Sequence, residues 1–165
     1  MAKITLGGND TSTNGELPEI GTKAPDFLLT DSDLKDHRLS DFSGTKLILN
    51  IVPSLGTGVC QSSAKKFNEL ASGLESTKVL VISADLPFAQ GAFCGQEGLE
   101  NIMTLSQMRN RDFGKDYGIE IQDGKFQGLA ARSVVVLDEN HKVVYTQLVP
   151  EIGQEPDYDK AVAAI

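Results

Sequence analysis

The chain of 165 residues has the size of one ordinary domain, with 40% hydrophobic and 23% charged residues. Its net charge of −8 argues against nucleic acid or an anionic membrane surface as a partner, because binding to phosphate groups requires a basic surface. No stretch is long and apolar enough for a signal peptide or a membrane span, and we expect a cytoplasmic protein. No linker, repeat or low-complexity segment divides the chain, so we expect a single domain over residues 1–165.

The first predicted element is a small N-terminal β-hairpin in residues 3–13, around the Gly-Gly-Asn-Asp turn signal at residues 7–10. A short strand is predicted at residues 27–30. A short helical turn at residues 39–44, ended by Gly44, then leads into the centre of the fold.

The apolar run of residues 47–52 predicts a strand that is buried on both faces of a mainly parallel sheet. Pro53 ends this strand because it has no N–H group to donate. Apolar residues at intervals of three and four then predict a helix over residues 58–73. A second buried strand at residues 78–84 completes a β-α-β unit, which requires parallel strands and a right-handed crossover.

The second half of the chain is predicted to continue the alternation of helices and strands. The predicted helices are a short one opened by Pro87 and closed by Gly95, one at residues 109–117 and one at residues 156–165. The predicted strands are residues 98–105, 133–137 and 142–148, the last two forming a hairpin. This order describes an α/β, thioredoxin-like fold with a central mixed sheet and flanking helices.

The chain has few residues that bind transition metals. Its two cysteines, Cys60 and Cys94, have no metal-ligand spacing, and in a reducing compartment a bridge between them is expected to be transient and catalytic. His37 and His141 lie far apart in polar, turn-like stretches, and we expect both to be solvated. The acidic residues between positions 31 and 36 lack the spacing of a calcium loop and are interpreted as a solvated turn. The sequence therefore predicts no metal site.

Cys60 lies in the first turn of the helix predicted at residues 58–73. Unpaired N–H groups and the helix dipole favour a thiolate there, and cysteine reactivity follows thiolate content. The helix and the return strand are of similar length, about 24 Å and 23 Å, so Asp85 returns to the level of Cys60. Both lie at the carboxyl edge of the strands, where open α/β sheets place active sites, and Cys94 can lie within reach. The alternative is that Cys60 is a small buried side chain at a packed turn.

Three motifs resemble a known family. Pro53, Thr57 and Cys60 spell Pro-x-x-x-Thr-x-x-Cys, which resembles the active-site motif of the peroxiredoxins, and its context resembles the bacterial thiol peroxidase branch. The segments SADLPFAQ and FCG, within residues 83–95, and GLAAR, at residues 128–132, resemble further stretches of that branch. The similarity extends from about residue 4 to residue 161. Two departures, a glycine at position 56 and an alanine at position 92, put in doubt the local turn geometry and the docking of a reductant.

The resemblance implies a thiol-dependent peroxidase with an antioxidant role that reduces hydrogen peroxide and organic hydroperoxides. Cys60 would be the peroxidatic residue that becomes a sulfenic acid, and Cys94 would be the resolving residue that condenses with it into an intramolecular disulfide. Thioredoxin would reduce this disulfide. The resemblance also implies a homodimer and requires no flavin, haem or metal cofactor.

Three further residues are candidates for the site. The resemblance places a peroxide-binding arginine at Arg132, although a solvent-facing arginine is the general expectation at a strand end. Thr57 is interpreted as the N-cap of the helix and as a hydroxyl directed toward the sulfur, although capping alone would explain it. Pro53 is expected to close the pocket against water, and it would look the same if it only terminated the strand.

Two other functions remain open from the residues. A thiol-disulfide oxidoreductase on the same fold would carry Cys-x-x-Cys, but Ser63 stands three residues after Cys60. A non-catalytic binding domain is the second alternative, and the five candidate residues speak against it. Thiol counting after addition of a hydroperoxide would separate the three functions.

Overall fold

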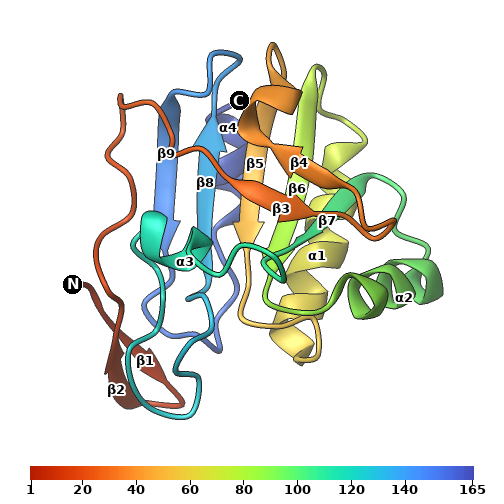
Figure 1. Ribbon diagram of the computed structural model, residues 1–165. Coiled ribbons are helices and arrows are strands. Elements are labelled where there is room, and N and C mark those ends of the chain that lie inside the picture. Colours follow the sequence, from red (N-terminus) through yellow and green to blue (C-terminus); the bar gives the residue numbers. More distant parts are fainter.

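The computed structural model describes residues 1–165 and consists of one seven-stranded mixed sheet, the helices that flank it and a separate two-stranded hairpin (Figure 1). The sheet has the strand order β4-β3-β7-β6-β5-β8-β9. The strands are β1 (Lys3–Leu6), β2 (Asn9–Ser12), β3 (Leu28–Thr30), β4 (Asp36–Arg38), β5 (Lys46–Ile51), β6 (Thr77–Ser83), β7 (Ile102–Ser106), β8 (Ser133–Leu137) and β9 (Val143–Leu148). The helices are the 3₁₀ helix η1 (Leu39–Phe42), α1 (Gly58–Ala71), α2 (Pro87–Glu97), α3 (Phe113–Asp116) and α4 (Tyr158–Ala163). The predicted thioredoxin-like α/β fold with its N-terminal hairpin is confirmed.

The central strand β5 pairs in parallel with β6 and antiparallel with β8. Its side chains alternate between two apolar cores: Leu49 and its neighbours two residues away face one core, and Ile48 faces the other. The β5-α1-β6 unit has the predicted parallel geometry, whereas β8 and β9 make the sheet as a whole mixed.

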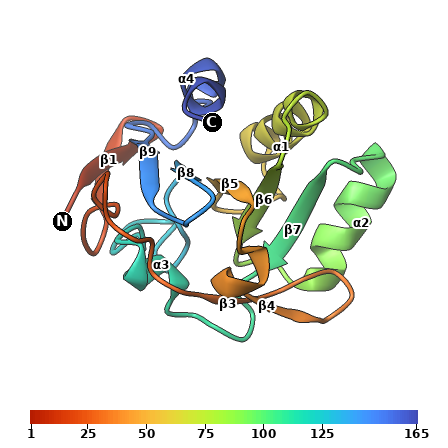
Figure 2. The same cartoon turned by 90° about the horizontal axis from the view of Figure 1, so that it is seen from above.

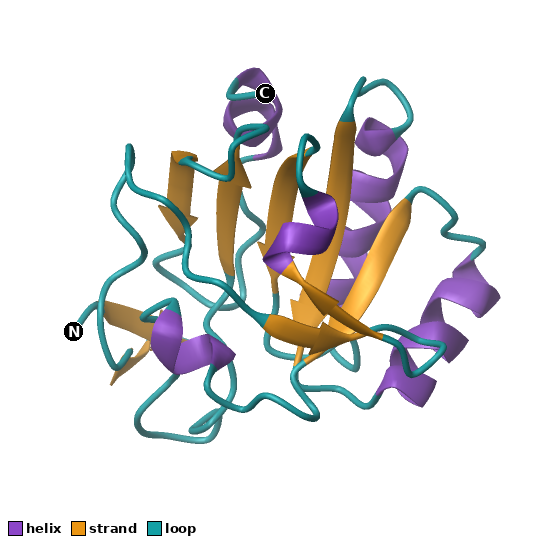
Figure 3. Ribbon diagram, turned by 45° about the horizontal axis from the view of Figure 1, so that its top comes forward, coloured by secondary structure: helices purple, strands orange, loops and turns teal.

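Helices α1 and α4 lie together on one face of the sheet, as the view from above shows (Figure 2). Helix α2 packs against β7 at the side of the sheet. The short β3–β4 hairpin runs obliquely across the ends of the longer strands, on the face opposite to α1 (Figure 3). None of the helices combines the length and the apolar character that crossing a bilayer requires.

Several predicted boundaries differ from the structure. Helix α2 passes the predicted end at Gly95 and stops at Gly98, whose φ of 65° is left-handed and whose N–H donates to the carbonyl of Cys94. Strand β7 therefore begins only at Ile102. Helix α3 has four residues in place of the predicted nine-residue segment 109–117, and the strand β4 was not predicted.

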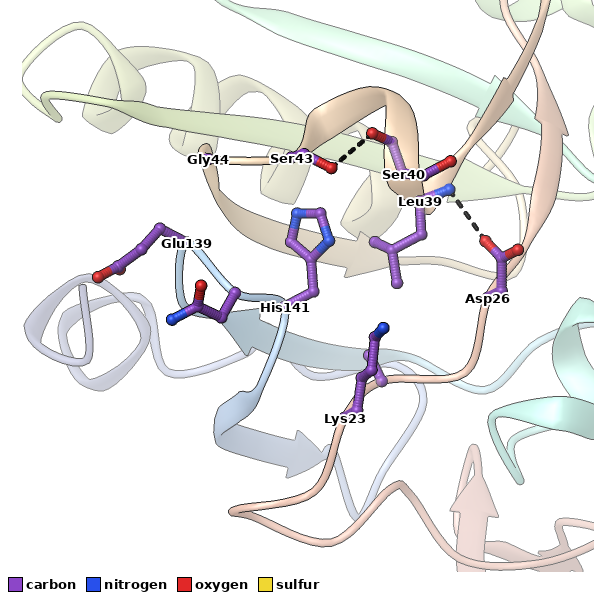
Figure 4. Close-up of a pocket in the computed structure, with 10 residues that line it drawn as sticks. Lys23, Asp26, Leu39, Ser40, Ser43, Gly44, Glu139 and His141 are labelled. Atoms are coloured by element: carbon purple, nitrogen blue, oxygen red, sulfur yellow. Dashed lines mark hydrogen bonds between the residues drawn. The ribbon is translucent and has the colours of Figure 1, made fainter.

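Both histidines depart from the solvated state predicted for them. His141 is buried and its Nε2 lies 2.9 Å from the carbonyl oxygen of Phe42. His37 is partly buried, with Nε2 2.7 Å from Oδ2 of Asp31. His141 lines a pocket near the amino end of β5, the edge of the sheet opposite to Cys60 (Figure 4). The turn between β8 and β9 packs on η1, a tertiary contact that a local reading of the polar stretch does not reveal.

Candidate active site

Cys60 lies at the carboxyl end of β5, in the first turn of α1. Helix α1 begins at Gly58, as predicted, because Pro53 stops the strand and the following turn frees the chain to change direction. The Cys60 side chain is 0% exposed and belongs to the apolar core between the sheet and α1. Pro53 is also buried and lies just beyond the end of β5. The sulfur is therefore shielded from bulk water.

Arg132 provides the charge next to this sulfur. It immediately precedes β8, and because Ser133 pairs with Ile51 at the end of β5, the two strands bring Arg132 and Cys60 together. The Arg132 side chain is 2% exposed, and its Nη2 lies 3.3 Å from Cys60 Sγ. The alternative of a solvent-facing arginine is thus excluded by the structure.

The guanidinium is only partly satisfied. Its Nε donates to the carbonyl oxygen of Ile152 at 2.8 Å, which orients the plane of the group, while Nη1 has no hydrogen-bond partner. A buried cationic N–H without a partner carries a free-energy cost. Such an N–H next to a nucleophile is suited to donate a hydrogen bond to an oxygen atom of a substrate.

Thr57 occupies the N-cap position of α1, as predicted, but its hydroxyl makes no cap hydrogen bond. The hydroxyl instead donates to the carbonyl oxygen of Ser54 at 3.1 Å. The predicted capping contact is wrong: no helix N–H donates to this hydroxyl, which is oriented toward the preceding turn. A role of this hydroxyl toward a substrate stays a prediction.

Asp85 holds the turn that precedes Cys60, and the sequence did not reveal this contact. Its carboxylate accepts hydrogen bonds from the hydroxyl of Ser54 at 2.6 Å and from the backbone N–H of Leu55 at 2.7 Å. The hydroxyl of Ser83 donates to the same carboxylate at 2.7 Å. The only sequence signal was that Asp85 follows a buried strand at the carboxyl edge of the sheet.

Cys94 lies in α2 and has a different environment. Both cysteines are free thiols, and Cys94 is partly buried against the same apolar core that contains Cys60. Burial raises the pKa of the Cys94 thiol above its ordinary value, because a thiolate is poorly solvated there. Each cysteine sits within a helix. The fold thus brings both to one core but holds them on separate elements.

No group of three or more histidine, cysteine or acidic side chains is arranged to hold a metal ion. The guanidinium of Arg132 is the charged group that contacts the Cys60 sulfur. The arrangement of a buried thiol, a cation and an unpaired N–H is suited to nucleophilic attack by sulfur on an electrophile whose leaving group is an oxygen.

Known proteins are similar to this chain in sequence and in fold. The model of the Redoxin family matches residues 19–162. A thiol peroxidase of Corynebacterium glutamicum is 53% identical over 165 residues, covering 100% of this chain and 99% of that protein. The crystal structure of a peroxiredoxin-like protein from Aquifex aeolicus has a TM-score of 0.93 and 38% identity, over 99% of this chain and 95% of that one. A thiol peroxidase structure from Chromobacterium violaceum, at 24% identity and a TM-score of 0.89 over 96% of this chain and 91% of that one, shares the fold.

These matches define the class of protein as a thioredoxin-like peroxiredoxin. The chain belongs to the Redoxin family. The resemblance to the bacterial thiol peroxidases that was predicted from three short motifs is confirmed over the full length of the chain.

Proposed function

We propose that this protein reduces hydrogen peroxide and organic hydroperoxides with the thiol of Cys60 and resolves the product with Cys94. The enzyme is a thiol-dependent peroxidase. The observation that carries the assignment of residues is the contact of 3.3 Å between Arg132 Nη2 and Cys60 Sγ, with Nη1 of the same guanidinium left unpaired.

The first step is attack of the Cys60 thiolate on one oxygen of the hydroperoxide. The S–O bond forms, the O–O bond breaks, and the departing oxygen takes up a proton to leave as water or an alcohol. Arg132 supports both ends of this step, since its charge stabilises the thiolate before attack and Nη1 can donate to a peroxide oxygen. Pro53 and the apolar core exclude water from the sulfenic acid that results.

The second step is condensation of the sulfenic acid with the thiol of Cys94, which forms the intramolecular disulfide and releases water. The position of Cys94 at the apolar core that contains Cys60 supports this step. The third step is transfer of two electrons from an external dithiol protein, for which we propose thioredoxin. A disulfide that must be reduced in every cycle requires a reducing compartment, and we therefore place the protein in the cytoplasm.

The rival function of a thiol-disulfide oxidoreductase receives less support. Ser63, at the position of the second cysteine of a Cys-x-x-Cys motif, is buried and donates its hydroxyl hydrogen bond to the carbonyl oxygen of Cys60. Asn50 of β5 donates to the hydroxyl of Ser63. These contacts give position 63 a structural role within α1 and leave no second thiol in that turn.

Thiol titration tests the function directly. Reduced protein mixed with one equivalent of hydrogen peroxide should lose two thiols rapidly, and thioredoxin with its reductase should restore them. Glutathione disulfide serves as the matched oxidant, because a thiol-disulfide oxidoreductase would react faster with it than with the peroxide. Loss of thiols to glutathione disulfide alone would contradict the peroxidase assignment.

We also propose a homodimer in which each catalytic disulfide lies within one chain. Peroxide-treated protein should then migrate at the monomer mass on a non-reducing gel, while sedimentation without denaturant gives the dimer mass. A covalent dimer that forms with the wild type and disappears in Cys94→Ser would show that the two cysteines meet across subunits.

A further inference from the structure

A chain of buried and partly buried hydrogen bonds connects the segment that presents Cys60 to the helix that carries Cys94. Its centre is the carboxylate of Asp85, which accepts from Ser54 and Leu55 on the Cys60 side. The same carboxylate accepts from the hydroxyl of Ser83, at the last position of β6. Ser83 in turn accepts from Nε2 of Gln90, in α2, at 3.0 Å.

The direction of donation runs through the whole chain toward the carboxylate. A hydroxyl that donates to a carboxylate is a better acceptor on its other side, so the Ser83–Gln90 and Ser83–Asp85 hydrogen bonds strengthen each other. The second hydrogen of Gln90 Nε2 is donated to the carbonyl oxygen of Leu105, on β7, at 3.0 Å. Gln90 is one helical turn before Cys94, on the same side of α2, so this contact ties that turn of the helix to the sheet.

Gln90 is not fully satisfied in this position. Its side chain is 0% exposed, yet its Oε1 has no hydrogen-bond partner. A buried acceptor without a partner gains hydrogen bonds to water when the segment opens, which lowers the cost of opening. The two hydrogen bonds of Nε2 thus hold α2 against the sheet, and the unpaired Oε1 lowers the free-energy cost of releasing the helix.

We propose that Asp85 and Gln90, joined through Ser83, are positioning residues that make the Cys60 segment and α2 open together. This proposal rests on the proposed function, in which two cysteines on separate helices must meet within each cycle. A disulfide requires Cα atoms within about 7 Å, so release of these segments precedes the bond between the sulfurs. The shared carboxylate couples the two releases by position: Gln90 anchors the hydroxyl of Ser83, and that hydroxyl anchors Asp85. Loss of the Gln90 contact frees the carboxylate to move and so loosens its contacts with Ser54 and Leu55.

The test compares two glutamines of the same helix, Gln90→Leu and Gln96→Leu. Gln96 is exposed and takes no part in the hydrogen-bond chain, so its variant controls for the loss of a helix glutamine. In the reduced proteins, amide exchange of Leu55 is the reporter, because its N–H donates to Asp85 but lies far in sequence from position 90. We expect about tenfold faster exchange at Leu55 in Gln90→Leu than in Gln96→Leu, the size of effect that loss of one or two net hydrogen bonds produces.

The second readout separates the two chemical steps. The chain has no tryptophan, so quenched reaction and intact mass are used to follow the sulfenic acid and the disulfide after mixing with hydrogen peroxide. In Gln90→Leu, formation of the sulfenic acid should keep the wild-type rate while formation of the disulfide is about tenfold faster. Ser83→Ala, which removes the shared hydroxyl, should reproduce both effects and replaces Gln90→Leu if that variant does not fold.

Faster exchange confined to residues 87–97, with an unchanged Leu55 amide, overturns the coupling. A disulfide step no faster than that of Gln96→Leu also overturns it. The exchange measurement needs no peroxide, whereas failure of wild-type protein to lose thiols to peroxide would contradict the proposed function itself, so the two failures are distinguishable.

Discussion

The surroundings of Cys60 and Cys94 differ in burial and in the charge next to the sulfur. Cys60 is completely buried, lies in the first turn of a 14-residue helix and has a guanidinium nitrogen 3.3 Å from its sulfur. Cys94 is partly exposed, lies near the end of an 11-residue helix, and burial without a cationic partner raises the pKa of its thiol. Burial alone therefore does not make a cysteine reactive. The two sulfurs differ in the guanidinium that lies next to that of Cys60.

The same comparison bears on the order of events. Burial disfavours the thiolate of Cys94 and so makes it a poor nucleophile until it is exposed to water, whereas the guanidinium beside Cys60 suits that sulfur to attack in the closed structure. The two environments thus favour attack on the peroxide by Cys60 first and a contribution from Cys94 only after local opening. Four measurements test this difference between the two cysteines.

Exchange of the two cysteines for serine should have the largest effect. Cys60→Ser should lower peroxidase turnover at least about a thousandfold, because a serine hydroxyl remains protonated and is a far weaker nucleophile. Cys94→Ser serves as the matched control and should still reduce one equivalent of peroxide per chain before it stops. The comparison would be reversed if Cys60→Ser kept turnover while Cys94→Ser lost the first oxidation.

Replacement of Arg132 should have the next largest effect. Arg132→Ala should slow oxidation of Cys60 by peroxide about a hundredfold, the factor for loss of charge-assisted hydrogen bonds that contribute about 2–3 kcal/mol. Arg111, which is exposed, provides the control Arg111→Ala, expected within about twofold of wild type. Quenched-flow mixing with peroxide followed by intact mass gives the rate of Cys60 oxidation, and circular dichroism checks that the fold is intact. An unchanged rate in folded Arg132→Ala would remove this residue from the mechanism.

The disulfide form should be more mobile around Cys94 than the reduced form. Helix α2 contains internal glycines and ends at a left-handed Gly98, so it is marginal without its contacts to the sheet. We expect amide exchange in residues 86–96 to be about tenfold faster in the disulfide form, with residues Val79 to Ile82 of strand β6 (Thr77–Ser83) as the unchanged internal control. Equal protection of α2 in both redox states would mean that the sulfurs meet without local opening.

The pH dependence of Cys94 should show the smallest effect. In Cys60→Ser, alkylation of Cys94 by iodoacetamide should rise with a midpoint above that of the same protein in urea, because burial raises the thiol pKa only in the folded state. The folded state holds the Cys94 proton to higher pH than the unfolded state does. The contribution of Cys94 to the free energy of unfolding is therefore lost as the pH rises through the folded pKa. A midpoint that does not move on unfolding would show that Cys94 is as well solvated as in an unfolded chain.

Much of the fold and of the site could be predicted from local sequence. The run before Pro53 predicted the central strand, and the start of α1 at Gly58 placed Cys60 in a first turn, because strand termination and helix initiation depend on a few adjacent residues. The family resemblance then indicated Arg132 as a partner of Cys60. Local patterns also predicted the parallel pairing of β5 and β6 around α1, since the crossover rule needs only the order and length of the elements.

Other features were decided only by tertiary structure. The burial of His141, the missing cap hydrogen bond of Thr57 and the extension of α2 to Glu97 depend on packing and on backbone geometry that a local pattern does not contain. The contact of Asp85 with the turn before Cys60 joins residues about thirty positions apart, and its strength depends on where three donors converge. Residue types and spacing therefore determined which groups were present at the carboxyl edge of the sheet. Only the folded chain determined which of their hydrogen bonds were made, because that depends on distances of a few tenths of an ångström between elements remote in sequence.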